Sequence, residues 1–160
     1  MSAPLEHTLV AVTFERYFSG ETFDKVPPHI TILPWFDARG RMCVIDEVVK
    51  ETEPFSIVRD GPMTVGGQGH EKKAVSVKSP ALIKLHEELF KRLVENGVEF
   101  SHPLWLGSQY TPHYRKLEDR DPFDEHPEMV INEIAIFDNI AVRGLSKGKK
   151  IVTYLRMGDA

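Results

Sequence analysis

The segments Val26-Pro27-Pro28-His29-Ile30-Thr31-Ile32-Leu33 and Tyr110-Thr111-Pro112-His113-Tyr114-Arg115-Lys116-Leu117 resemble each other. In each, a proline directly precedes a histidine, and the residue before a proline is held extended. The two histidines lie 84 positions apart, about half of the 160-residue chain. We therefore expect an approximate internal duplication, in which each half contributes one histidine-bearing strand to a shared cleft.

The hydrophobic pattern around these segments predicts a mixture of strands and two helices. The expected strands are residues 7–14, 29–36, 55–59, 74–78, 113–117, 129–137 and 150–157. The expected helices run from Asp37, as N-cap, to about Thr52, and from Ser79, as N-cap, to the stop at Asn96-Gly97. This order lacks a regular strand–helix alternation, so it favours an α+β architecture over a doubly wound parallel sheet. We expect residues 1–160 to form one domain of two pseudo-repeated lobes.

Composition and charge narrow the class of protein. The chain is 41% hydrophobic and 28% charged, which is ordinary for a globular domain, and no apolar run approaches the ~18 residues of a membrane span. A net charge of −4 argues against bulk binding of nucleic acid. Cys43 is the only cysteine, so an internal disulfide is excluded. We expect the Cys43 side chain to pack on the buried face of the first helix. These features favour a cytoplasmic protein, which we expect to be a monomer.

The two histidine segments carry the residue types of acid–base chemistry on phosphate. Residues i and i+2 of a strand share a face about 6.5–7 Å apart, which places Thr31 beside His29 and Arg115 beside His113. Histidine transfers protons near neutral pH, and a hydroxyl or a guanidinium holds phosphate oxygens. Two such pairs across one phosphate would supply a base for the entering oxygen and an acid for the leaving oxygen, without a metal ion.

These residues resemble the two-histidine (2H) phosphoesterases, which include bacterial 2′-5′ RNA ligase-like proteins and RNA cyclic phosphodiesterases. The family carries a His-x-Thr/Ser motif in each lobe of a pseudo-symmetric α+β fold. His29-Ile30-Thr31 matches this motif fully, whereas His113-Tyr114-Arg115 departs at its third position. The resemblance implies antiparallel sheets with two helices outside and a central cleft, with His29 and His113 as the catalytic pair.

The resemblance also implies a substrate class: a nucleotide or RNA end with a 2′,3′-cyclic phosphate or a 2′-5′ linkage, cleaved without a cofactor. Thr31 would bind a phosphate oxygen, and Arg115 would replace the missing hydroxyl with a guanidinium fork. We expect Trp35 and Tyr110, near the motifs, to bind substrate by stacking on a base. Tyr114 alternates away from His113, which predicts a place in the core.

Three other interpretations stay open at this stage. A domain of the same fold could bind a nucleotide or RNA end without cleaving it, because the second motif lacks its hydroxyl. A metal-dependent hydrolase could use His102, His113 and His126 with nearby carboxylates, although no His-Glu-x-x-His or Cys-x-x-Cys spacing occurs. Both motif histidines could also be structural, as we expect for His86 on the apolar stripe of the second helix.

Overall fold

The computed structural model describes residues 7–66, 69, 71–100, 106–117, 119–140 and 148–158. Their strands form two antiparallel sheets, in agreement with the expected α+β class. The first sheet has the order β2 (Thr22–Phe23), β9 (Lys149–Arg156), β8 (Glu133–Asn139), β1 (Thr8–Thr13) and β3 (His29–Phe36). The second has the order β6 (His113–Arg115), β5 (Lys72–Lys78), β4 (Phe55–Val65) and β7 (Glu128–Ile131).

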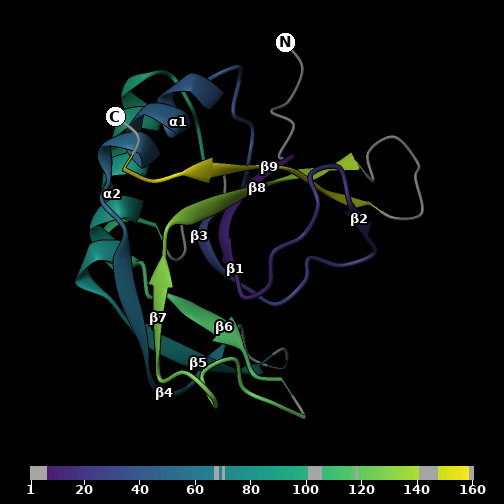
Figure 1. The fold of residues 1–160 in the computed structure, drawn as a ribbon. Coiled ribbons are helices and arrows are strands. Elements are labelled where there is room, and N and C mark those ends of the chain that lie inside the picture. The colour runs from purple at the N-terminus through teal and green to yellow at the C-terminus, as the bar shows by residue number, and fades with distance from the viewer. Residues whose placement is uncertain are drawn as a thin grey trace.

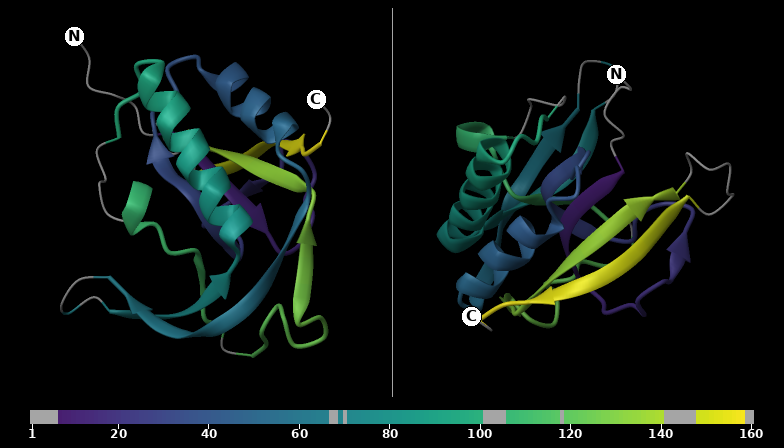
Figure 2. Two further views of the ribbon diagram at one scale, coloured as in Figure 1. Left: turned by 90° about the vertical axis from the view of Figure 1, so that its left-hand side faces the viewer. Right: turned by 90° about the horizontal axis from the view of Figure 1, so that it is seen from above.

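Two helices, α1 (Met42–Glu51) and α2 (Pro80–Glu95), pack against each other, and α2 also contacts strands of both sheets. Figures 1 and 2 show the helices together on one side of the molecule, with the sheets behind them. Ser79 caps α2 as expected, because its side chain accepts a hydrogen bond from the Leu82 amide. The main core fills the space between helices and sheets and includes Ile32, Ile45 and Leu89. Neither helix of the described residues is long and apolar enough to cross a membrane.

The segment expected as one strand over residues 129–137 is two strands in different sheets. Met129 pairs with Ile57 in the second sheet, whereas Glu133 pairs with Arg156 in the first. The change of sheet takes place at Asn132, whose carbonyl accepts a hydrogen bond from the amide of Met157. The apolar residues on either side of Asn132-Glu133 pack into the same core, and so periodicity alone does not reveal the break.

Strand β4 extends beyond the expected end at Arg59, through Gly61-Pro62, to Val65. A proline lacks the amide that a central strand requires. Strand β7 pairs with β4 only over Phe55–Val58, so at Pro62 the missing donor faces an open edge. A shift of register between Arg59 and Gly61 precedes it. The longer strand gives β5 a partner along its whole length.

The first helix begins later than expected. Asp37 is not its N-cap, because Asp37 accepts a hydrogen bond from the Arg39 amide within a turn, and Arg41 occupies the cap position. Arg39 and Gly40 both have positive φ, so the chain must turn before a helix can start. The expected burial of Cys43 is also wrong, since its side chain is exposed.

Candidate active site

The cleft lies where the edges of the two sheets meet. Strands β3 and β6 are edge strands of their sheets and lie in contact. A cleft of about 560 Å³ is lined by His29, Thr31, His113 and Arg115, together with Lys72 and six other residues. A larger hollow of about 660 Å³ over β4 and β5 contains neither histidine, so volume does not identify the site. The structure thus brings the two motifs into one cleft.

Both histidines are held by the same local hydrogen bond. The Nδ1 atom of His29 lies 2.8 Å from the carbonyl of Pro27, and the Nδ1 atom of His113 lies 2.8 Å from the carbonyl of Thr111. A carbonyl only accepts, so each Nδ1 carries the hydrogen and donates. Each acceptor stands immediately before a proline, where the extended backbone of that residue fixes the direction of its carbonyl. In the neutral ring of each histidine the lone pair therefore lies on Nε2.

The first motif contains a further contact between its members. The Oγ1 atom of Thr31 lies 3.1 Å from Nε2 of His29. With Nδ1 protonated, the neutral ring accepts at Nε2, so the hydroxyl donates. The Arg115 guanidinium has no acceptor atom and offers only donors at the matching position beside His113. The two motifs are therefore similar in backbone geometry and different in what they offer a phosphate.

The environment of His29 favours its neutral form. Burial lowers the pKa of His29 below 6.5, the hydrogen bond to Pro27 works in the opposite direction, and the charge of nearby His113 lowers the pKa further. The coupling between the two rings follows from their place in one cleft. At neutral pH, His29 is therefore in the form that accepts a proton.

Two side chains behind β3, His86 and Tyr110, support the first motif. His86 is fully buried on α2, as expected, and its Nδ1 donates to the carbonyl of Ile32 at 2.7 Å. Its Nε2 accepts a hydrogen bond from the Gly107 amide at 2.9 Å. Tyr110 stacks on the His86 ring with centroids 3.9 Å apart and donates from its hydroxyl to the Thr31 carbonyl at 2.8 Å.

Tyr110 is therefore a core residue. The prediction that its ring stacks on a base is wrong, because one face covers His86 and only 8% of the residue is exposed. Its hydroxyl instead holds the backbone at Thr31. The other ring, Trp35, is partly buried beside a second apolar cluster, with the Lys149 ammonium 5.7 Å from its centroid, and does not line the cleft.

Tyr114 lies in the core, as its alternation with His113 predicts. It is 2% exposed, and its hydroxyl donates to both carboxylate oxygens of Asp121, at 2.9 and 2.8 Å. Arg59 pairs with the same carboxylate at 3.3 Å. Burial and this carboxylate raise the pKa of Tyr114, so the ring keeps its hydrogen and anchors β6 from behind.

The histidines invoked for a metal site do not converge. His126 is exposed and lines a different hollow from the one that holds His113, and His102 is outside the described residues. Among the described residues, no group of three or more histidine, cysteine, aspartate or glutamate side chains is placed to hold a metal ion.

Lys72 is a cleft residue that the two histidine motifs do not identify. It lines the cleft with His113 and Arg115, but its local sequence, Glu71-Lys72-Lys73, is typical of any solvated strand end. The pairing of β5 with β6, which sets Ala74 opposite Arg115 and Ser76 opposite His113, brings it to the site. Such a long-range register has no local signal.

The paired sheets and their histidine-bearing edge strands have the fold of the 2H phosphoesterases. No family model and no curated protein matches the sequence. TT0787 of Thermus thermophilus is 14% identical, with a TM-score of 0.58 over 95% of this chain and 98% of that one. A structure described as a phosphoesterase is 11% identical, with a TM-score of 0.59 over 97% and 99%. E. coli LigT complexed with 3′-AMP is 12% identical, with a TM-score of 0.58 over 97% and 99%.

Proposed function

We propose that this chain is a phosphodiesterase that cleaves a nucleotide or RNA phosphodiester, a 2′,3′-cyclic phosphate or a 2′-5′ linkage, with His29 and His113 as its acid–base pair. One observation carries the proposal: both histidines line one cleft, and both are fixed by the same Nδ1 hydrogen bond to the carbonyl two residues earlier. A structural role requires no such duplicated orientation of a ring nitrogen. The fold shared with phosphoesterases supports the same class of reaction.

The lowered pKa of His29 supports His29 as the base in hydrolysis. His29 Nε2 takes a proton from the entering water as its oxygen forms a bond to phosphorus. The bond between phosphorus and the leaving ribose oxygen breaks, and protonated His113 gives its Nε2 proton to that oxygen. The cycle closes when a proton passes from His29 back to His113 through solvent.

Thr31 and Arg115 hold the phosphate during this transfer. When substrate enters, the Thr31 hydroxyl turns from His29 Nε2 to a phosphate oxygen, which frees the base. Arg115 offers a fork of N–H donors to the charge that grows on the phosphoryl oxygens. This chemistry uses no metal ion or organic cofactor. LigT, which shares the fold, has been solved with 3′-AMP and with NADP⁺, in keeping with a nucleotide in the cleft here.

The test is turnover in the presence of EDTA of 2′,3′-cyclic mononucleotides, 2′-5′ dinucleotides and cyclic dinucleotides. His29→Ala and His113→Ala should each lose at least ~10²-fold in kcat. The matched control is His126→Ala, an exposed histidine outside the cleft, which should keep wild-type turnover. Activity that disappears with EDTA and returns with a divalent ion would overturn the two-histidine mechanism in favour of a metal-dependent one.

The departure at Arg115 supports a second candidate, a nucleotide-binding module without catalysis. It predicts saturable binding of the same compounds with no product. If wild type binds but does not turn over any member of the panel, the binding module replaces the enzyme. If both histidine variants also bind as wild type does, the histidines have no role at the site.

A further inference from the structure

The cleft continues past the histidines into a strongly basic hollow. This neighbouring space of about 420 Å³ is bordered by Lys72, Lys73, Arg115, Lys116 and Leu117, so four of its five lining residues are cationic. Lys72, Arg115 and Lys116 also line the histidine cleft. The two spaces therefore form one path that leads from the reacting phosphate along the ends of β5 and β6.

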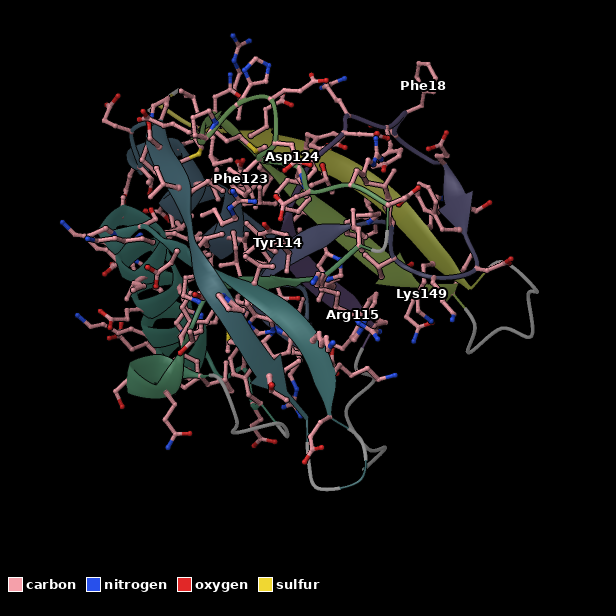
Figure 3. All side chains as sticks on the ribbon, turned by 90° about the horizontal axis from the view of Figure 1, so that it is seen from below. Phe18, Tyr114, Arg115, Phe123, Asp124 and Lys149 are labelled. Carbon is pink, nitrogen blue, oxygen red and sulfur yellow. The ribbon has the colours of Figure 1, made fainter. Side chains whose placement is uncertain are left out.

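Sheet geometry places two of these cations on the catalytic face. Ser76 is opposite His113 and Ala74 is opposite Arg115. Alternation along β5 then puts Lys72 on the face of His113 and Arg115. Arg115 lies about 6.5–7 Å from His113 along the strand, a separation comparable to that between consecutive phosphates of RNA. In Figure 3, Arg115 lies on the side of β5 away from the helices, whereas Tyr114 lies toward the centre of the molecule.

A backbone hydrogen bond, rather than ion pairs, holds the ends of β5 and β6 together. The Lys116 amide donates to the carbonyl of Lys73 at 3.1 Å, and this bond keeps four like charges within one short stretch of two strands. None of the four has an ion pair with a carboxylate among the described residues. Arg115 differs in this from most other arginines of the described residues, such as Arg59 and Arg92, which do have one. Clustered cations without counter-charges bind anions strongly, because an anion removes their mutual repulsion.

We propose that this basic hollow is a second phosphate site, and that the substrate is a nucleotide with a further phosphate one nucleotide step from the scissile diester. The inference rests on the proposed function and narrows its substrate class. Lys72 holds the second phosphate, Arg115 reaches between it and the scissile phosphate, and Lys73 and Lys116 add positive charge nearby. It also explains the departure of the second motif, since a guanidinium fork reaches between two phosphates and a Ser or Thr hydroxyl does not.

Turnover tests the site with three substrates: adenosine 2′,3′-cyclic phosphate, the same compound with a 5′-phosphate, and ApA ending in a 2′,3′-cyclic phosphate. Either substrate with a second phosphate should exceed the first by at least ~10-fold in kcat/KM. The 5′-phosphate and dinucleotide arms distinguish a terminal phosphate from an internal one. In the double variant Lys72→Gln/Arg115→Gln the ratio should fall to about 1. The control Lys84→Gln/Lys91→Gln makes the same change of charge at exposed positions of α2 and should keep the ratio.

Equilibrium binding separates failure of this site from failure of the proposed function. Adenosine 3′,5′-bisphosphate should bind at least ~10-fold more tightly than 3′-AMP by calorimetry, and the double variant should remove the difference. Turnover of all three substrates at equal kcat/KM would overturn the second phosphate site and leave the phosphodiesterase standing. With no turnover at all, tighter binding of the bisphosphate would still support the site, and equal affinities would overturn it.

Discussion

Replacement of His86 by leucine tests how the first histidine strand is held. His86 is fully buried, and its ring makes two hydrogen bonds, one to the Ile32 carbonyl and one from the Gly107 amide. Its face also stacks on Tyr110 at 3.9 Å. A leucine of similar size fills the space but offers no donor or acceptor. The substitution therefore removes polar contacts from the core and changes its packing little.

The structure sets the magnitude of the loss. The Ile32 carbonyl is buried and would lose its partner at a cost of about 1–3 kcal/mol, whereas the Gly107 amide is half-exposed and would recover part of its bond from water. Loss of the stacked pair adds about 0.5–1.5 kcal/mol. We expect His86→Leu to lower the free energy of unfolding by about 2–4 kcal/mol. Against an ordinary stability of about 5–15 kcal/mol, the variant should still fold.

Urea denaturation followed by circular dichroism measures this loss, with the exposed His126→Leu as the matched control. That control should stay within about 0.5 kcal/mol of wild type. The variant should also lose turnover, because the backbone at Ile32 and Thr31 is no longer held. A change in unfolding free energy below about 1 kcal/mol would refute the reasoning, since it would mean that water replaces His86 as the partner of both groups in the variant.

Three further results are expected. The free energy of unfolding should fall as the pH drops below about 6.5, because His29 and His86 both have lowered pKa values and the unfolded chain takes protons first. The slope approaches about 1.4 kcal/mol per pH unit for each histidine. His86→Leu should reduce this slope in urea titrations at several pH values. The acid limb of kcat/KM should have its midpoint below about pH 6.5, since His29 must be neutral to act as base, and a midpoint above about 7 would contradict that role. Tyr110→Phe should lower the free energy of unfolding in urea by about 1 kcal/mol and should lower kcat, because the hydroxyl that holds the Thr31 carbonyl is lost. An unchanged kcat would mean that Tyr110 has a structural role only.

The parts of the fold that the sequence predicts well are those with local causes. Ser79, Pro80 and the leucine stripe define α2 within one helix, and β3 begins with alternating half-buried and buried residues over residues 29–32. The two proline–histidine pairs predicted a shared cleft because an internal duplication has a simple consequence in space. These expectations required no knowledge of which distant strands pair.

The expectations that were wrong depend on tertiary contacts. The strand breaks at Asn132 because β7 pairs with β4 in one sheet and β8 pairs with β9 in the other. Asp37 lies outside the helix because the chain turns through positive φ at Arg39-Gly40. Tyr110 is aromatic and near a motif, which is typical of a stacking platform, yet the buried imidazole of His86 uses its face. No local pattern predicts that pairing.

Within the site, sequence reasoning found the histidines and their i+2 neighbours but left their roles open. The pKa of His29 is lowered chiefly by burial, and that burial depends on α2 packing behind β3. Trp105, a third aromatic residue close to the second motif in the sequence, lies outside the described residues. The catalytic roles of His29 and His113, and the phosphate contacts of Thr31 and Arg115, stay predictions that the turnover measurements test.

The two halves of the site share a backbone motif and differ in their support, and the proposed mechanism gives each half a different role. Strand β3 is backed by the main core, and Tyr110 and His86 hold its backbone there, so His29 is desolvated and neutral. Strand β6 is a three-residue edge strand whose outer side opens onto the basic hollow. Burial therefore suits the first half to accept a proton. Positive charge suits the second half to receive an anion.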